Sequence, residues 1–268
     1  SRAAQHPNVV AALAAAAQRA QATGRTQWVA LPVSLAATDA LGLFAAHAQH
    51  ERFLLERPAH GVQVLGLGAR RVLLADGASR YEKIAGEARA LAEDAHTIQP
   101  DPRPPAPPLL VGGFAFADGG GRGEWDAFGA ARLTLPVLAS VRREGFATTV
   151  LWQAFEPGDD PDSVARRGDE AIARWTSSAP DASLPAPALN VPQFRARADA
   201  PHAAFTDLVE LALRSIAAGD FQKVVVARSV ELSRPEGFDA VRVVDDLRRS
   251  QPSCTHFAVG RAGAAFVG

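Results

Sequence analysis

The stretch that decides the fold is Ile216-Ala-Ala-Gly219-Asp-Phe-Gln-Lys223-Val-Val-Val-Ala-Arg228. Apolar residues at helical spacing precede it, and they predict a helix over 201–218 that ends at Gly219. The run of valines and alanine that follows the lysine predicts a β-strand over 221–230. The chain therefore passes here from helix to strand, with a lysine inside the apolar strand.

Lys223 is one of only two lysines among the 28 basic residues of the chain. Side chains alternate across a strand, so Lys223 shares a face with Val225 and Ala227. Its stem could follow the surface, as lysines on edge strands often do. Alternatively, it lies in a cleft where desolvation lowers the pKa of the amine and makes it a usable base. The strand pattern by itself leaves both interpretations open.

Length and composition exclude several classes of protein. A chain of 268 residues buries roughly three quarters of its unfolded surface and needs no disulfide or structural metal. The net charge of -1 argues against nucleic acid or an anionic membrane as partner. No apolar run reaches the roughly 18 residues of a membrane span, and we find no signal peptide. The single cysteine, Cys254, cannot form an internal disulfide, which fits a reducing cytoplasm. After these exclusions we expect a cytoplasmic α/β enzyme.

Hydrophobic periodicity predicts the order of the remaining elements. Helices are expected over 1–24, 39–47, 81–96, 162–175 and 239–249. Strands are expected over 28–31, 53–56, 62–67, 72–74, 109–116, 131–141, 148–155, 255–259 and 264–268. Two hairpins are predicted, one over 53–67 and one over 131–155, and two adjacent glycines in 109–116 predict a strand that another backbone approaches closely.

Two segments rich in proline or in small residues interrupt this pattern. Residues 99–108 hold six prolines and predict an extended loop. Residues 177–192 are rich in Ser, Pro and Ala, and predict a linker between 1–176 and 193–268. His47 and His50 have the i, i+3 spacing of a metal pair, but a dedicated site needs three or four ligands, and we therefore predict no metal there.

Several stretches together resemble one known family. The 216–228 stretch resembles the helix-to-strand junction of the chorismate-utilising enzymes, and of the isochorismate synthases in particular. Similar stretches in the family's order are Arg52-Phe53-Leu-Leu-Glu56, Pro108-Leu-Leu-Val-Gly112-Gly113-Phe114, Trp125-Asp-Ala-Phe128, Pro252-Ser-Cys-Thr-His-Phe257 and Ala265-Phe-Val-Gly268. The resemblance covers residues 41–268 and implies an α/β (α+β) fold of large, mostly antiparallel sheets with helices packed outside.

The resemblance also implies an activity and a role for Lys223. Isochorismate synthases convert chorismate to isochorismate with Mg²⁺: water adds at C2 and the C4 hydroxyl leaves. Lys223 matches the family's base, which activates the water, whereas members that use ammonia carry glutamine there. The general acid and the Mg²⁺ ligands of the family follow the position of Gly268, so we expect an incomplete, inactive N-terminal two thirds of a monomeric enzyme.

Other functions stay open at this point. Salicylate synthases, which carry the same lysine, form isochorismate first and then eliminate pyruvate. A non-catalytic, chorismate-binding-like fragment is the alternative from another class. The sequence leaves open whether the isochorismate serves menaquinone or catecholate siderophore synthesis.

Overall fold

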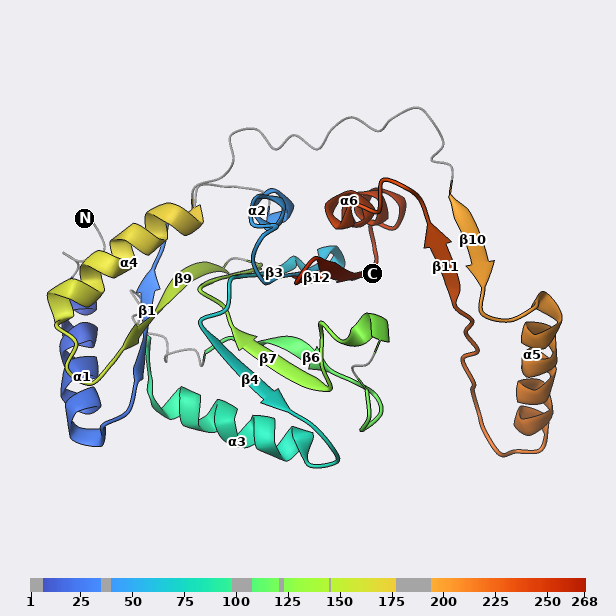
Figure 1. Cartoon of the computed structure of the whole chain (residues 1–268), viewed down its shortest axis with the longest axis horizontal. Helices are drawn as coiled ribbons and strands as arrows, with labels where there is room; N and C mark the ends of the chain where they lie inside the picture. Colours follow the sequence, from blue (N-terminus) through green and yellow to red (C-terminus); the bar gives the residue numbers. More distant parts are fainter. Residues whose placement is uncertain (1–6, 35–39, 98–107, 121–122, 145, 177–193) are drawn as a thin grey trace. The chain divides into compact units, whose positions relative to one another are not determined.

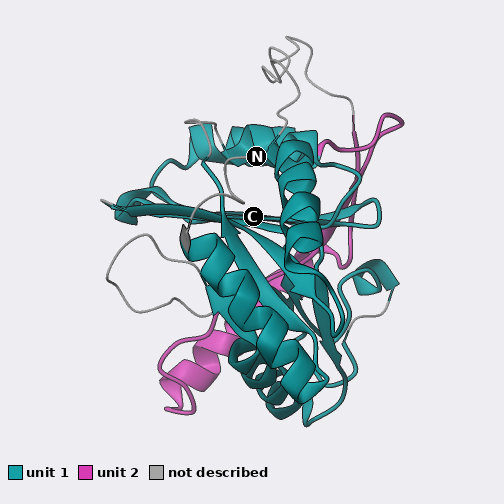
Figure 2. Ribbon diagram, turned by 90° about the vertical axis from the view of Figure 1, so that its left-hand side faces the viewer, with its two compact units in different colours: residues 1–184, 240–268 teal, residues 185–239 magenta. Residues whose placement is uncertain are grey.

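A computed structural model describes residues 7–34, 40–97, 108–120, 123–144, 146–176 and 194–268. Internal contacts divide the chain into two units, Ser1–Leu184 with Ala240–Gly268, and Pro185–Asp239, coloured separately in Figure 2. The predicted loop over 99–108 falls almost wholly outside the described residues, as does the linker over 177–192, and the division at 176 and 193 remains a prediction.

An eight-stranded sheet forms the centre of the first unit (Figure 1). All neighbouring strands are antiparallel except the parallel pair β1 and β5, which confirms the predicted mostly antiparallel sheet. In spatial order the strands are β13 (Ala264–Val267), β12 (His256–Arg261), β2 (Arg52–Arg57), β3 (Val62–Leu67), β8 (Leu138–Arg143), β9 (Phe146–Phe155), β1 (Gln27–Pro32) and β5 (Ala95–Thr97).

The main hydrophobic core lies between this sheet and four helices. A row of paired leucines crosses it: Leu67 faces Leu138, Leu138 faces Leu151, and Leu151 faces Leu31. All four are at most 1% exposed, and each contributes about 1.5–3 kcal/mol by burial. The helices are α1 (Pro7–Thr23), α2 (Ala40–Ala46), α4 (Pro161–Thr176) and α6 (Ala240–Ser250), all close to their predicted ranges.

A smaller layer covers part of the other face. Its three antiparallel strands run in the order β4 (Arg71–Ala75), β7 (Ala131–Leu135) and β6 (Val111–Phe114), with helix α3 (Arg80–Glu93) packed on them. A second buried cluster joins Trp152 and Ala30 of the large sheet to Leu135 of β7 and Leu91 of α3.

Two predicted boundaries in this unit are wrong. The single strand expected over 131–141 is two strands, because Pro136 lacks the N–H that a continuous ladder needs. Strand β7 joins the small sheet and β8 the large one, so only β8 and β9 form the predicted hairpin. The helix expected over 81–96 ends at Glu93, because Ala95–Thr97 pairs with β1 as an edge strand.

The second unit contains helix α5 (His202–Ala217) and a two-stranded sheet of β10 (Arg195–Ala198) and β11 (Val230–Ser233). The predicted helix is confirmed, and Gly219 follows it with a φ of 83°. The predicted strand over 221–230 is wrong except at its last residue, because 221–229 have no strand structure. In the described part of this unit, no strand lies beside them to accept their backbone hydrogen bonds.

Short 3-10 turns occupy Pro58–His60 and Gly123–Trp125. Of the helices that the structure describes, none is both long enough and apolar enough to cross a lipid bilayer.

Candidate functional site

Lys223, the predicted base, lies six residues beyond the end of α5, which closes at Ala217. The helix closes as the sequence predicts: the Gly219 N–H donates to the Ile216 carbonyl at 3.1 Å and the Asp220 N–H to the Ser215 carbonyl at 3.0 Å. This C-terminal turn fixes where the chain leaves the helix, and therefore where the segment with Lys223 begins.

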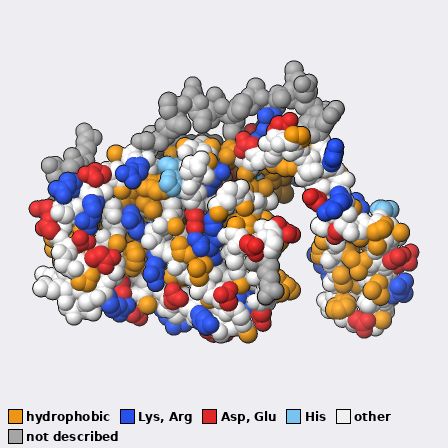
Figure 3. Space-filling model, viewed as in Figure 1, with side chains coloured by type: hydrophobic (Ala, Val, Ile, Leu, Met, Phe, Trp, Pro, Cys, Tyr) orange, Lys and Arg blue, Asp and Glu red, His pale blue; other side chains and the backbone are white. Residues whose placement is uncertain are grey.

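The surroundings of Lys223 are open to solvent. Its side chain is exposed and forms no ion pair with any residue that the structure describes. Nearby apolar residues are also exposed, with Val225 at 81% and Phe221 at 57%, and Figure 3 shows hydrophobic side chains gathered over α5. A lysine acts as a base only where desolvation favours its neutral form. The described residues of this unit do not supply that environment.

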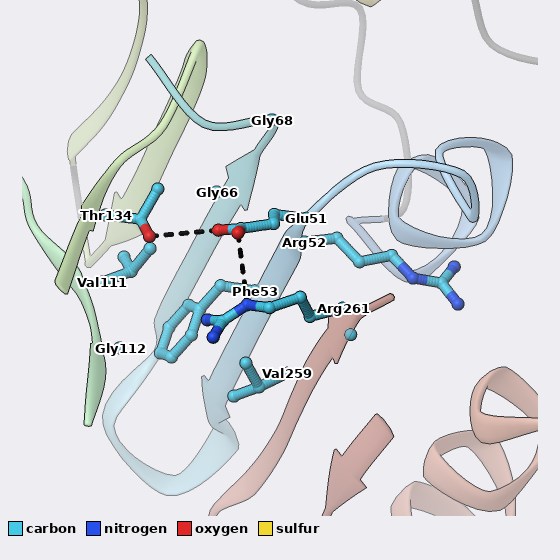
Figure 4. Close-up of a pocket in the computed structure, with 11 residues that line it drawn as sticks. Glu51, Arg52, Phe53, Gly66, Gly68, Val111, Gly112, Thr134, Val259 and Arg261 are labelled. Atoms are coloured by element: carbon cyan, nitrogen blue, oxygen red, sulfur yellow. Dashed lines mark hydrogen bonds and ion pairs between the residues drawn. The ribbon is translucent and has the colours of Figure 1, made fainter. Parts of the chain in front are cut away.

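A cluster of charged and polar residues lies between the two sheets of the first unit, and Figure 4 shows three of its members, Glu51, Thr134 and Arg261. Glu51 directly precedes β2 of the large sheet, Arg132 and Thr134 lie on β7 of the small sheet, and Arg261 ends β12. Three segments that are distant in the sequence therefore meet at one carboxylate. We refer to these four residues as the Glu51 cluster.

The Glu51 carboxylate receives contacts on both oxygens. The Thr134 hydroxyl donates to Oε2 at 3.1 Å, and Arg132 forms an ion pair and hydrogen bond with Oε1. Arg261 Nε lies 3.2 Å from the same Oε1, and its guanidinium donates to the Ala127 carbonyl at 2.5 Å. Burial lowers the pKa of Arg261, while the charge of Glu51 raises it and that of Arg132 lowers it.

Glycines let the two sheets approach closely beside this cluster. Gly112 on β6 has a φ of 150°, and a Cβ there would lie 2.1 Å from the Arg132 carbonyl oxygen. The predicted close backbone approach at 109–116 is thereby confirmed. The cavity that remains is about 20 Å³, room for a water molecule or an ion of similar size. Chorismate, which has many more atoms, does not fit in it.

The Glu51 cluster does not follow from the sequence pattern. Its members lie at positions 51, 132, 134 and 261, and no spacing rule connects them. One signal was present: Arg132 is the one charged residue in the stretch over 131–141.

Metal ligands do not gather in the described parts of the chain. Within those ranges no three His, Cys, Asp or Glu side chains are placed to share an ion. His47 and His50 instead pack against Trp175, with ring centroids 5.0 and 4.7 Å away, and the His47 ring nitrogen Nε2 lies 3.2 Å from the Trp175 carbonyl oxygen. In the described structure the two histidine rings therefore pack on one tryptophan.

Comparison with known families identifies the chain's relatives. The family described as "Chorismate binding enzyme" matches residues 13–268. The chain belongs to the chorismate-binding enzyme family. The match extends over both units, and it confirms the family resemblance stated from the sequence.

Two solved structures are similar to this family member. The menaquinone-specific isochorismate synthase from Escherichia coli has a TM-score of 0.59 and 22% identity, and the match covers 97% of this chain and 55% of that one. A structure assigned as a 2,3-dihydroxybenzoate-specific isochorismate synthase from Bacillus anthracis has a TM-score of 0.46 and 14% identity, covering 82% and 43%. No curated protein matches. The chain thus spans about half the length of these structures, and the first match shows the shared fold.

Proposed function

We propose that this chain is part of a cytoplasmic, monomeric isochorismate synthase. In this reaction water adds at C2 of chorismate, the C4 hydroxyl leaves and the double bond moves, so that the product is an isomer of the substrate. The observation that carries the proposal is the family match over residues 13–268. The similarity in fold to the isochorismate synthase from E. coli supports it.

We assign the role of general base to Lys223. Its neutral amine would take a proton from the attacking water, which is the step that ammonia-using relatives do not need. The assignment rests on the resemblance of the 216–228 stretch to the family. It requires that 221–229 become covered in the working enzyme, since an exposed lysine is a poor base at neutral pH.

Magnesium is implied by the family resemblance, but the described residues do not fit it. No three potential ligands converge in the portion of the chain with assigned structure. We therefore assign no residue of this chain to the ion and derive no step through it. For the same reason, and because Lys223 is exposed, we expect the 268 residues by themselves not to turn over chorismate.

The test uses the gene product that contains these 268 residues, together with the isolated chain. Each is incubated with chorismate and Mg²⁺, and the products are separated by chromatography. We expect isochorismate from the gene product and none from the isolated chain. Salicylate with pyruvate would identify a salicylate synthase instead. A gene product of intact mass near 28 kDa without turnover would favour a non-catalytic chorismate-binding protein.

A further inference from the structure

The helix-facing side of the large sheet becomes polar beyond its leucine row. That row is buried under helices. Since side chains alternate along a strand, the same face continues two residues further along each strand. The next two rows on it are Leu65, Ser140 and Thr149, then Gln63, Arg142 and Ala147. Within two rows, a wholly apolar face therefore gains hydroxyl, amide and guanidinium groups.

A cavity of about 310 Å³ lies over these two rows. The rows form its floor, and Leu43 of helix α2, which packs on β2 and β3 (Figure 1), forms part of its wall. At roughly 30 Å³ for each water molecule, this is the volume of about ten waters. Small-molecule sites begin at about this size. The cavity therefore has room for a metabolite, which the 20 Å³ space beside Glu51 does not have.

The floor of this cavity offers hydrogen-bonding groups that are already held in place. The Ser140 and Thr149 hydroxyls lie 2.9 Å apart, and whichever of them donates, the hydrogen of the other stays available. The Gln63 amide is oriented by its N–H, which donates to the Glu56 carboxylate at 2.8 Å. Its oxygen accepts no hydrogen bond from any residue that the structure describes. The floor can therefore both donate to and accept from a hydroxylated ligand.

Arg142 adds a positive charge to the lining. It is the one charged side chain among the described residues that line the cavity. It forms no ion pair within the described ranges of the chain. A guanidinium presents its N–H donors in a fixed fork that matches a carboxylate. Because Arg142 is exposed and unpaired, it can bind a carboxylate without breaking an internal contact.

We propose that this cavity binds a small hydroxylated carboxylate. The carboxylate pairs with Arg142, hydroxyl groups bond to the floor, and the carbon skeleton lies against Leu43 and Leu65. An inorganic anion would use only the arginine, and a hydrocarbon only the apolar wall. The site lies on the opposite face of the large sheet from the Glu51 cluster, in the unit that does not contain Lys223, and it does not depend on the proposed chorismate chemistry.

The experiment measures binding of quinate, a cyclohexane ring with a carboxylate and several hydroxyl groups, to the 268-residue chain by isothermal titration calorimetry. Cyclohexanecarboxylate lacks the hydroxyl groups and inositol lacks the carboxylate, so they test the two kinds of contact separately. At equal ionic strength we expect each to bind at least about tenfold more weakly than quinate. Equal binding of quinate and cyclohexanecarboxylate, or no detectable binding of quinate, would overturn the proposal.

Two variants test whether binding needs both the arginine and the cavity. Arg142→Gln removes the charge, and we expect quinate affinity to fall at least about tenfold, as the loss of charge-assisted hydrogen bonds does. Ala147→Trp fills the cavity and keeps every polar group, and we expect a similar loss; Ala147 is exposed, so the ring does not enter the core. Arg143→Gln is the matched control: this neighbouring arginine is exposed on the other face of the strand and should bind quinate like wild type.

The melting temperature of each variant without ligand checks that it folds. Weaker binding in Arg142→Gln with unchanged binding in Ala147→Trp would mean that surface charge attracts quinate outside the cavity, and would overturn the proposal. A folded Arg142→Gln chain that binds quinate as tightly as wild type would overturn it as well.

Discussion

The leucine row of the large sheet and the valine run at 224–226 both consist of apolar residues from stretches predicted to be strands, but their environments are opposite. Leu67, Leu138, Leu151 and Leu31 are buried side by side in paired strands under helices. Val225 is 81% exposed in a segment with no paired strand. An apolar run becomes a strand only when neighbouring strands satisfy its backbone, so apolar sequence alone does not determine strand structure.

Helix α5 shows the same contrast for a helix. It has apolar residues around much of its circumference, yet none of its residues is buried, and Leu211 is 53% exposed. The helices of the first unit bury residues such as Val164 and Val244 completely. A helix that is apolar on most sides is normally buried. The second unit therefore has an exposed apolar surface on α5, close in sequence to Lys223, the residue that we propose as the base.

The largest expected effect is the loss of activity on replacing Lys223, which tests whether the exposed segment 221–229 takes part in catalysis in the working enzyme. Lys223→Ala in the gene product should reduce kcat by roughly 10²- to 10⁴-fold, as the loss of a general base does. The Michaelis constant should change much less, and Lys223→Gln should be similarly slow. The measurement is steady-state conversion of chorismate, with melting temperature as a check on folding.

Lys83→Ala is the matched control, because Lys83 is the chain's other lysine and is exposed on α3. It should leave kcat unchanged. Near-wild-type kcat in Lys223→Ala would remove the catalytic assignment, and the lysine would then be an ordinary surface residue.

The next effect compares truncation of a leucine in each unit. Leu65→Ala opens a cavity under α2 in the first unit and should cost about 2–5 kcal/mol of unfolding free energy. Leu211→Ala on α5 should change it by less than about 0.5 kcal/mol. Urea unfolding followed by far-UV circular dichroism measures both. A comparable loss from Leu211→Ala would mean that α5 is packed in solution, which would break the contrast between the units.

Local patterns predicted most of the first unit, because its strands and helices have the periodicity of their buried faces. The hairpin of β2 and β3 and the helix α4 follow from such patterns alone. The Glu51 cluster could not be predicted, because its members meet only through the pairing of distant strands. The error at 221–229 has the opposite cause: the local pattern of a strand was present, and the partner strands were not.

Two glycines with similar backbone angles extend the comparison to single positions. Gly68 has a φ of 71°, and a Cβ there would lie 2.5 Å from the Trp175 ring. Gly219 has a φ of 83°, with nothing within 4 Å of the added atom. Gly68→Ala should cost about 2–4 kcal/mol through backbone strain and overpacking, and Gly219→Ala about 1 kcal/mol through strain alone. Urea unfolding midpoints of the two variants measure both losses of stability. Equal losses would contradict the contribution of overpacking at Gly68.

The smallest expected effect is a pH dependence from His47 in the first unit. Burial lowers the pKa of His47, a hydrogen bond with the Trp175 carbonyl oxygen raises it, and the charges of His50 and Arg52 lower it further. The folded pKa is therefore below that of the unfolded chain, about 6.5. Above that pH neither state carries the proton, and no stability depends on it.

As the pH falls through 6.5, the unfolded state binds the proton first, so the folded chain loses stability until the pH is below the folded pKa. His96, whose pKa burial also lowers, acts in the same direction, so His47 accounts for only part of the loss. We expect His47→Gln to reduce the difference in urea midpoint between pH 7.5 and pH 5.5, while the exposed His60→Gln leaves it unchanged. Because burial lowers the pKa of His47 while the Trp175 hydrogen bond raises it, we expect the loss of stability from His47 to be smaller than that caused by Leu65→Ala. If His47→Gln and wild type lose stability equally over this range, the ring titrates alike in both states, and its contacts with Trp175 do not shift its protonation in solution.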